Sequence, residues 1–436
     1  MTEKFVIQGG EPLRGEIQAA GNKNAALPIL ATCLLTSEEL VLTNVPRIRD
    51  TEAQVAILEQ LGVKAEWGPN HELRLQADSV TETAPDEDLS ARIRASFLLA
   101  GPLLARFGEA RMPPPGGDFI GRRRLDPHLD AFLDMGATVE GSRWIEIKGP
   151  AGGLKPCSVF MDEPSVMGTE NALMAAALTT GPTTIANAAS EPHVQDLARL
   201  LVKMGAQIDG IGSNVMTVHG RDKLGGAEHR VCPDHIEVAS FVALAAATGG
   251  DLRISETAPE DLHMVVRAFG RLGLDLVIEG TDVVVPPNQK LAIRDDLGDA
   301  IPKIEDGPWP AFPADLTSIA LALATQAEGT ILIFEKMFEN RLFFVDKLVA
   351  MGARITLCDP HRAIVSGPSR LHGERVESPD IRAGMAILIA ALCADGTSEI
   401  GNVVQIDRGY EAIDERLRGL GARIERVAVD RVPAAG

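Results

Sequence analysis

One carboxylate lies in a glycine-rich segment directly before three consecutive arginines. The segment spans residues 113–128 and contains Gly116-Gly117-Asp118 followed by Arg122-Arg123-Arg124. Glycine adopts backbone conformations closed to other residues, so such a loop is able to fold over a ligand. Arginine offers planar, permanently charged donors for phosphate or carboxylate, and an adjacent acid is a candidate proton donor. The pattern predicts a mobile anion-binding loop, and the alternative is an ordinary solvated charged loop.

The overall charge gives this basic cluster its significance. The 436 residues include 42 Lys and Arg against 61 Asp and Glu, a net charge of −19. A field of that sign repels nucleic acids and anionic membranes, so a local run of arginines indicates a small anionic ligand. One Tyr and three Trp also argue against a base-stacking surface. We therefore expect no nucleic-acid partner and no membrane insertion, and no obligate protein partner is evident.

The cysteines and the N-terminus indicate the compartment. The five cysteines are odd in number and scattered, without metal-ligand spacing, which is typical of free thiols in a reducing cytosol. Cys232 and His235 are two possible metal ligands. Without a second cluster of ligands, their proximity is expected to be incidental. Residues 1–23 lack the apolar core of a signal peptide, and no apolar run is long enough to span a bilayer. These features predict a cytoplasmic protein.

A repeat sets the architecture. A triplet of the type Leu/Met-Gly-Ala recurs at intervals of 74, 69, 68, 79 and 69 residues, centred on Gly62, Gly136, Gly205, Gly273, Gly352 and Gly421. Glycine is the expected residue just past the end of a helix. A period near 70 residues suits a unit of two helices and several strands.

Within each repeat an Ala/Leu-rich helix precedes a short β-branched strand. The expected helices are 24–35, 95–106, 171–179, 238–247, 315–325 and 382–394, and the clearest strands are 39–43, 183–186, 330–334 and 354–357. Helices that are apolar on every side are typical of buried helices. The sequence therefore predicts helices packed inside and sheets wrapped around them.

Six repeats divide into two groups of three, which predicts two pseudo-threefold α/β domains. Residues 23–230 form the first domain and carry the 113–128 loop. Residues 1–22 and 231–436 form the second, which the strand at 5–8 would complete. Two thin crossings allow the domains to hinge, so the active site is expected in the interdomain cleft.

Seven segments, in order, resemble the enolpyruvyl transferases over residues 5–426. They are Gly21–Pro28, Arg94–Ser96, Gly116–His128, Pro310–Asp315, Phe338–Arg341, Asp380–Ala383 and Ile406–Glu411. The resemblance implies a two-domain inside-out α/β barrel. It also implies transfer of the enolpyruvyl group of phosphoenolpyruvate to the 3-hydroxyl of UDP-N-acetylglucosamine, through a tetrahedral ketal and with release of phosphate. That reaction is the first committed step of peptidoglycan synthesis and uses no metal or organic cofactor.

The resemblance also assigns residue roles. The implied catalytic residues are Asp118, Asp315, Lys23 and Arg408. The implied substrate-binding residues are Asn24, Arg94, Arg123, Asp126, His128, Ser165, Val166, Met337, Arg341, Asp380 and Arg382. Some of these have structural alternatives: Lys23 and Asn24 as helix caps, and Asp380 as an ion-pair partner, a role that we favour outright for Asp407.

Several positions depart from the family pattern. Asp118 stands where most members have a cysteine, which implies resistance to fosfomycin, a drug that alkylates that cysteine. Arg124, Pro127, Glu163 and Met167 differ near the acceptor site. Two other functions therefore stay open: a paralogous transferase with a different phosphorylated acceptor, and a non-catalytic nucleotide-sugar-binding relative.

Overall fold

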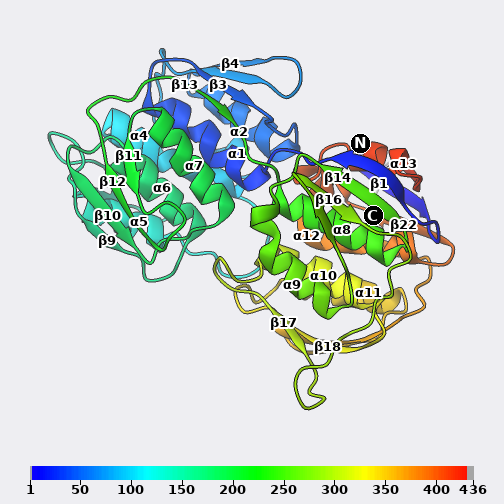
Figure 1. Cartoon of the computed structure of the whole chain (residues 1–436). Helices are drawn as coiled ribbons and strands as arrows, with labels where there is room; N and C mark the ends of the chain where they lie inside the picture. The colour runs from blue at the N-terminus through cyan, green and yellow to red at the C-terminus, as the bar shows by residue number, and fades with distance from the viewer. Residues whose placement is uncertain (1, 430–436) are drawn as a thin grey trace, which may run out of the picture. The chain divides into compact units, whose positions relative to one another are not determined.

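The computed structural model describes residues 2–429, which fold into two compact units (Figure 1). We call residues 20–118 and 123–232 the N-terminal unit, and residues 2–19, 119–122 and 233–429 the C-terminal unit. Residues 119–122 group with the C-terminal unit because Ile120 O accepts a hydrogen bond from Asn340 N (3.0 Å) and Arg122 N donates to Glu339 Oε2 (3.2 Å). The 113–128 segment is thus split between the units rather than carried by one of them.

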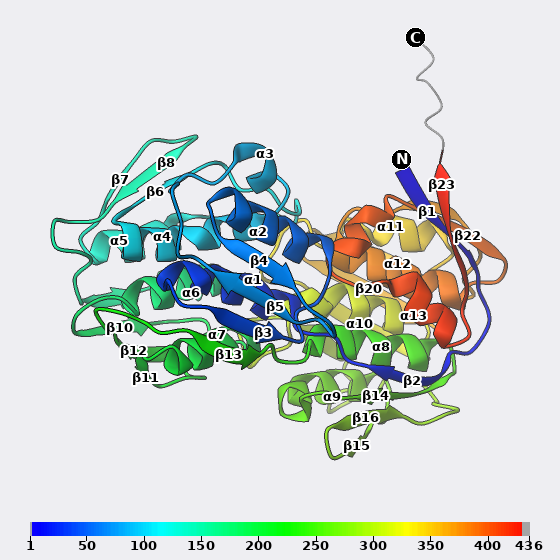
Figure 2. The same ribbon diagram turned by 90° about the horizontal axis from the view of Figure 1, so that it is seen from above.

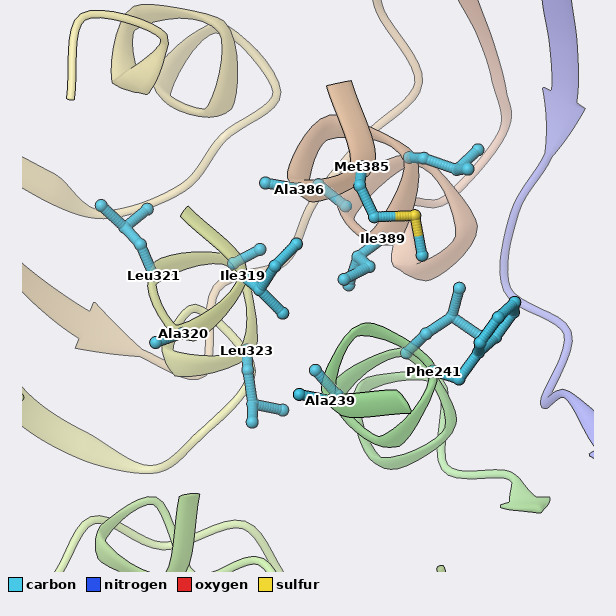
Figure 3. Packing of buried hydrophobic residues seen from close by; sticks show 14 of the residues in the cluster. Ala239, Phe241, Ile319, Ala320, Leu321, Leu323, Met385, Ala386 and Ile389 are labelled. Atoms are coloured by element: carbon cyan, nitrogen blue, oxygen red, sulfur yellow. The ribbon is translucent and has the colours of Figure 1, made fainter. Parts of the chain in front are cut away.

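Three buried helices form the centre of the C-terminal unit: α8 (His235–Ala247), α10 (Thr317–Ala324) and α12 (Ile381–Cys393). Their residues are apolar or small on every side, so no face prefers water and each helix packs against the other two. Figure 3 shows Ile319 of α10 and Ile389 of α12 pointing into the space between their helices, and Leu323 of α10 beside Ala239 of α8. The predicted inner helices are confirmed.

Three four-stranded sheets belong to the C-terminal unit. Their orders are β21 (Arg375–Glu377), β22 (Thr397–Gly401), β1 (Thr2–Gln8), β23 (Arg423–Val429); β15 (Val277–Glu279), β16 (Asp282–Val285), β14 (Asp251–Ser255), β2 (Arg14–Gln18); and β17 (Lys303–Glu305), β18 (Gly329–Phe334), β20 (Arg362–Gly367), β19 (Ile355–Asp359). Strand β1 pairs antiparallel with both β22 and β23, so the N-terminal strand completes this unit as predicted (Figure 2). Alternating burial along β14, β20 and β22 turns one face of each sheet to the helices.

The N-terminal unit repeats the plan around α1 (Lys23–Ala31), α4 (Ala100–Phe107) and α6 (Val166–Ala176), all largely buried. Its sheets are β13 (Ala227–Arg230), β3 (Leu40–Thr43), β5 (Leu73–Gln76), β4 (Lys64–Trp67); β6 (Glu109–Met112), β8 (Ile145–Lys148), β7 (Thr138–Glu140); and β11 (Gln207–Asp209), β12 (Val215–His219), β10 (Pro182–Ala186), β9 (Ser158–Phe160). Each unit therefore holds three sheets and three inner helices within residues 2–429.

Outer and short helices connect these layers. In the N-terminal unit they are η1 (Thr32–Leu35), α2 (Arg49–Gln60), α3 (Glu87–Ser90), η2 (Arg94–Leu99), α5 (Asp126–Asp134) and α7 (Pro192–Lys203). In the C-terminal unit they are η3 (Pro259–Leu262), α9 (His263–Arg271), η4 (Ala314–Leu316), α11 (Val345–Ala350), η5 (Val403–Arg408) and α13 (Ile413–Gly419). The η elements are 3₁₀ turns.

The six repeat glycines share one conformation. All have positive φ, between 83° and 116°, namely Gly62, Gly136, Gly205, Gly273, Gly352 and Gly421. Each follows the last residues of an outer helix, where a left-handed residue ends the helix and glycine meets no Cβ penalty. The triplets identified in the sequence therefore mark the same structural point in all six repeats.

Candidate active site

The carboxylate of Asp315 is the centre of the C-terminal unit's polar cluster. Its Oδ1 accepts a hydrogen bond from Arg341 Nη2 at 2.9 Å, and its Oδ2 lies 3.1 Å from both Nε and Nη2 of Arg382. The two arginine side chains are 3% and 5% exposed, whereas that of Asp315 is 28% exposed. Charge-assisted bonds on both oxygens fix the orientation of a carboxylate that solvent or a ligand still reaches.

Arg382 owes its position to the start of α12. The Asp380 carboxylate caps this helix by accepting from the backbone N–H groups of Arg382 (2.8 Å) and Ala383 (2.9 Å). Arg382 Nη1 also donates to the hydroxyl of Tyr410 at 3.2 Å. Burial opposes its charge, but Tyr410, Asp315 and Asp234 raise the pKa of Arg382 above its ordinary value. Arg382 is therefore a permanent cation in a buried setting, and Asp380 has a definite structural role as a cap.

Arg341 belongs to a loop that follows β18. The Glu335 carboxylate accepts from the backbone N–H groups of Met337 (3.3 Å) and Phe338 (3.1 Å), and the Arg341 guanidinium stacks 5.1 Å from the Phe338 ring. Burial opposes the charge of Arg341, whereas Asp315, Glu335 and Asp380 raise its pKa. The side chain of Met337 is exposed at the edge of this loop.

Arg408 and Asp407 have different partners. Arg408 Nη1 donates to Gln405 Oε1 at 2.8 Å. Asp407 accepts two hydrogen bonds of 2.8 Å from the guanidinium of Arg426, a bidentate pair. The structural role predicted for Asp407 is confirmed, with Arg426 rather than the adjacent arginine as its partner.

In the N-terminal unit Lys23 forms a buried ion pair. Its Nζ lies 2.9 Å from Asp50 Oδ2, and both side chains are almost fully buried. The cap of α1 is Asn22, whose Oδ1 accepts from the N–H groups of Asn24 (2.9 Å) and Ala25 (3.1 Å). The capping alternative proposed for Lys23 and Asn24 is therefore wrong.

Arg94 is held by carbonyl groups. Its Nη2 donates to Arg123 O at 2.5 Å and contacts Arg124 O at 3.4 Å. Burial and the charge of Arg123 lower the pKa of Arg94 to about 10. Gly117, with φ of 104°, approaches so closely that an added Cβ would lie 2.8 Å from Arg94 Cβ. The glycine thus brings the backbone that carries Asp118 directly onto Arg94.

Arg124, by contrast, is surrounded by acids. Its guanidinium contacts Asp162 at 2.7 Å, Asp126 at 3.2 Å and Glu163 at 3.9 Å. These carboxylates offset the charge of Arg124, whereas the charge of Arg123 acts on Arg94.

His128 is enclosed rather than open to solvent. It is buried, its ring lies edge-on to Phe97 at 5.1 Å, and Nδ1 is 2.8 Å from Asn171 Nδ2. Since an amide nitrogen only donates, Nδ1 is the acceptor and the ring carries its proton on Nε2. Burial, and then the charge of Arg94, lowers the pKa of His128 to about 3.

Ser165 and Val166 lie where α6 begins. Ser165 Oγ accepts from Gly168 N at 3.2 Å and caps the helix. Both residues are half-buried, so their remaining surface is available to a ligand.

Comparisons with known proteins identify the family of this chain. A family model described as EPSP synthase (3-phosphoshikimate 1-carboxyvinyltransferase) matches residues 7–417. The chain belongs to this family. Among curated members, UDP-N-acetylglucosamine 1-carboxyvinyltransferase of Bradyrhizobium diazoefficiens is 57% identical, covering 97% of this chain and 98% of that protein. The Treponema denticola protein of the same name is 54% identical, covering 97% and 99%.

Solved structures confirm the fold class of this EPSP synthase family member. The enolpyruvyl transferase NikO from Streptomyces tendae superposes with a TM-score of 0.86 at 24% identity, covering 98% of this chain and 100% of that one. EPSP synthase from Acinetobacter baumannii gives 0.76 at 19% identity, covering 98% and 100%. At these identities the likeness concerns the fold, which is the predicted two-domain inside-out α/β barrel.

The predicted residues cluster in the C-terminal unit of this family member, whereas in its N-terminal unit Lys23, Arg94 and His128 have separate partners. The C-terminal unit brings together Asp315, Arg341, Arg382 and Asp380, with Arg408 anchored separately on Gln405. The sequence analysis missed four residues that orient them, namely Asp50, Asp306, Glu335 and Tyr410. Only Glu335 carries a local signal, an acid directly after the apolar run at residues 331–334, because the other three lie in charged stretches.

Residues 2–429 of this family member contain no group of three or more His, Cys, Asp or Glu side chains arranged to hold a metal ion. No helix in that range has the length and apolar character needed to cross a membrane. The Cys232–His235 segment instead supports structure, since Cys232 N donates to Asp196 at 2.9 Å and Asp234 caps α8.

Proposed function

We propose that this chain is a UDP-N-acetylglucosamine 1-carboxyvinyltransferase. It transfers the enolpyruvyl group of phosphoenolpyruvate to the 3-hydroxyl of UDP-N-acetylglucosamine and releases phosphate, the first committed step of peptidoglycan synthesis. The observation that carries the proposal is identity above 50%, over nearly the whole chain, to curated proteins of that name. The sequence identity to an EPSP synthase of known structure is only 19%, so shikimate 3-phosphate is the weaker candidate for the acceptor.

In this proposal Asp315 is the base. It removes the proton from the 3-hydroxyl while that oxygen bonds to C2 of phosphoenolpyruvate, and C3 of the enol takes a proton from Asp118, the proposed acid. The product of this addition is a tetrahedral ketal. Loss of a proton from C3 and of phosphate from C2 then restores the double bond. The arginines that hold Asp315 keep its carboxylate aligned, which is the geometric requirement for proton transfer.

Cations supply what the donor needs. Phosphoenolpyruvate carries a phosphate and a carboxylate, and we assign Lys23, Arg94, Arg123 and Arg408 to binding these groups and stabilising the charge that develops on the leaving phosphate. Arg94 suits this role because burial and the neighbouring charge of Arg123 disfavour its cationic form and lower its pKa. An anion that binds beside Arg94 would offset both effects. We assign six of the other predicted contacts to the acceptor: Asn24, Asp126, His128, Ser165, Val166 and Met337.

We also propose that the enzyme works in the cytoplasm. All five cysteines are free thiols, as is usual in a reducing compartment.

The test is phosphate release from phosphoenolpyruvate with UDP-N-acetylglucosamine, beside reactions with shikimate 3-phosphate and without acceptor. Release only with the sugar nucleotide supports the proposal. Release only with shikimate 3-phosphate moves the chain to the other branch of the family. Binding of both substrates without phosphate release identifies a non-catalytic relative.

The loop residue Asp118 provides a second test. We propose that it serves as an acid, and a carboxylate is not the soft nucleophile that fosfomycin alkylates. The wild-type enzyme should retain its activity after incubation with fosfomycin, whereas Asp118→Cys should lose activity progressively with time. Time-dependent loss in the wild type would contradict this assignment of Asp118.

A further inference from the structure

Two buried acids, Glu335 and Asp306, hold the loop that leads to Arg341. Glu335 is 0% exposed and Asp306 is 1% exposed. Strands β17 and β18 are parallel, with Glu305 paired with Phe334, so the residue that follows each strand comes next in register. The sheet therefore sets Asp306 and Glu335 side by side, although 29 positions separate them in the sequence.

Each acid uses one oxygen to hold the loop that leads to Arg341. Glu335 Oε1 accepts from the N–H groups of Met337 and Phe338, and Asp306 Oδ1 accepts from Lys336 N. The main chain of Glu335 is fixed as well, since its N–H donates to His361 O at 2.8 Å. Three consecutive N–H groups of the loop thus depend on the two carboxyl groups.

The second oxygen of each acid lacks a donor. Glu335 Oε2 and Asp306 Oδ2 are buried, and no N–H or O–H group of the described residues hydrogen-bonds to either. Arg341 Nε lies 3.6 Å from Glu335 Oε2, an ion pair beyond hydrogen-bond length. Two buried acceptors without a donor cost free energy, and a proton on one of them would supply the missing hydrogen bond between the two carboxyl groups.

The surrounding charges favour one proton. Burial raises the pKa of Glu335 to about 8, with the charge of Arg341 opposing the shift and Asp306 adding to it. The other groups that face Glu335 are the hydroxyl of Thr317 on α10 and the His361 ring, whose Nδ1 lies 2.7 Å from Glu335 O. With one proton on the acid pair, the pair carries a single negative charge beside the Arg341 guanidinium.

We propose that Glu335 and Asp306 form a proton-sharing carboxyl pair that positions Arg341 on Asp315 and shapes the loop of Met337. Both are positioning residues, since neither contacts the reacting atoms. Loss of the shared proton adds a second negative charge beneath Arg341, which draws the guanidinium away from Asp315 and disorders the base. The inference rests on the proposed function for the role of Asp315.

Glu335→Gln tests the pair directly. The glutamine keeps an oxygen for the Met337 and Phe338 N–H groups and offers Asp306 a permanent N–H donor. The wild-type kcat should fall as pH rises above about 8, whereas Glu335→Gln should stay within about threefold of the wild type at pH 7 and lose the alkaline decline. Asp306→Asn supplies the donor from the other side and should abolish the decline in the same way.

Two controls frame this result. Glu305→Gln makes the same change one residue before Asp306, on a half-buried side chain paired with Lys303 and Lys336, and it should leave the alkaline decline in place. Glu335→Leu removes both the acceptor and the donor and should lower kcat at every pH. An unchanged alkaline decline in Glu335→Gln, or a kcat as low as that of Glu335→Leu, would overturn the proposal.

A stability measurement separates this inference from the proposed function. A carboxyl group whose pKa is raised in the fold makes its full contribution to stability below its unfolded pKa, and that contribution falls as pH rises through the window from about 4.5 to about 8. The Tm of Glu335→Gln should therefore gain on the wild type between pH 5 and pH 9, by more than about 3 °C. If phosphate release fails with every acceptor but this gain appears, the pair stands and the proposed function falls. If the Tm difference between Glu335→Gln and the wild type does not vary with pH, the two carboxyl groups do not share a proton.

Discussion

The two units treat their buried arginines in opposite ways. In the C-terminal unit, Arg341 and Arg382 share the carboxylate of Asp315, so positive and negative groups meet directly. In the N-terminal unit, the hydrogen-bond acceptors of Arg94 among residues 2–429 are the carbonyl oxygens of Arg123 and Arg124, and its pKa is lowered rather than raised. In the C-terminal cluster a carboxylate pairs with both arginines. In the N-terminal cluster the described partners of Arg94 are carbonyl groups.

This difference separates two tasks that one reaction requires. A base must be oriented before the substrate arrives, and a closed ion-pair network does that. A site for an anion must leave positive charge to be compensated by the ligand, and Arg94 has such charge. We therefore infer that the C-terminal unit is preorganised without ligand, whereas the N-terminal unit gains most from binding one.

The largest expected effect is that of Asp315→Asn. Asparagine keeps the shape and both arginines nearby, but it does not take up the proton, so kcat should fall by about 10³-fold, within the range for a lost general base. Binding of UDP-N-acetylglucosamine, measured by calorimetry, should change little. If the variant keeps wild-type turnover, Asp315 is only a structural partner of the two arginines. The C-terminal cluster would then not hold the base.

The next prediction contrasts Arg94→Met with Arg382→Met. Arg94→Met should raise the KM for phosphoenolpyruvate by about 10- to 100-fold, the value of one charge-assisted contact, and leave Tm unchanged or higher because a buried charge without a carboxylate is removed. Arg382→Met should lower Tm, since Asp315 loses one of its two cations, at a cost of about 2 kcal/mol. Equal losses of stability in the two variants would mean that the units do not differ in this way.

The repeating architecture was predictable because it depends on local patterns. Uniformly apolar helices must be buried, and a glycine after each outer helix marks the same left-handed turn in all six repeats, from Gly62 to Gly421. The N-terminal strand belongs to the second group of repeats, as predicted. This was predictable because the first group of repeats begins after that strand. Asp407 was also read correctly, as an ion-pair partner.

The residues that orient the site were not predictable. Glu335 and Asp306 meet only because β17 and β18 pair in parallel in one register, and register between distant strands is a tertiary property. Asp50, the partner of Lys23, lies in the first turn of α2, a different helix from that of Lys23. Tyr410 reaches Arg382 from beyond the end of α12. The split of the 113–128 segment likewise depends on Glu339 and Asn340, more than 200 positions away.

The smallest expected effect reports on the charge of Arg94 itself. His128 lies in the same unit, and burial together with the charge of Arg94 holds its pKa at about 3, so the ring should stay neutral down to pH 4 in NMR titrations of the imidazole signals. Because the folded pKa is below the unfolded value, this group favours unfolding as pH falls from about 6.5.

If Arg94 is a cation without a carboxylate, two changes should raise the pKa of His128: the Arg94→Met substitution, and binding of phosphoenolpyruvate to the wild type. Burial is the larger cause and remains, so the rise is partial. His235 in the C-terminal unit, whose pKa is lowered to about 4 by burial and by Arg382, is the internal control and should not respond to Arg94→Met. A His128 signal that ignores both changes would show that the charge of Arg94 is already compensated, and the two arginine clusters would then differ in geometry alone.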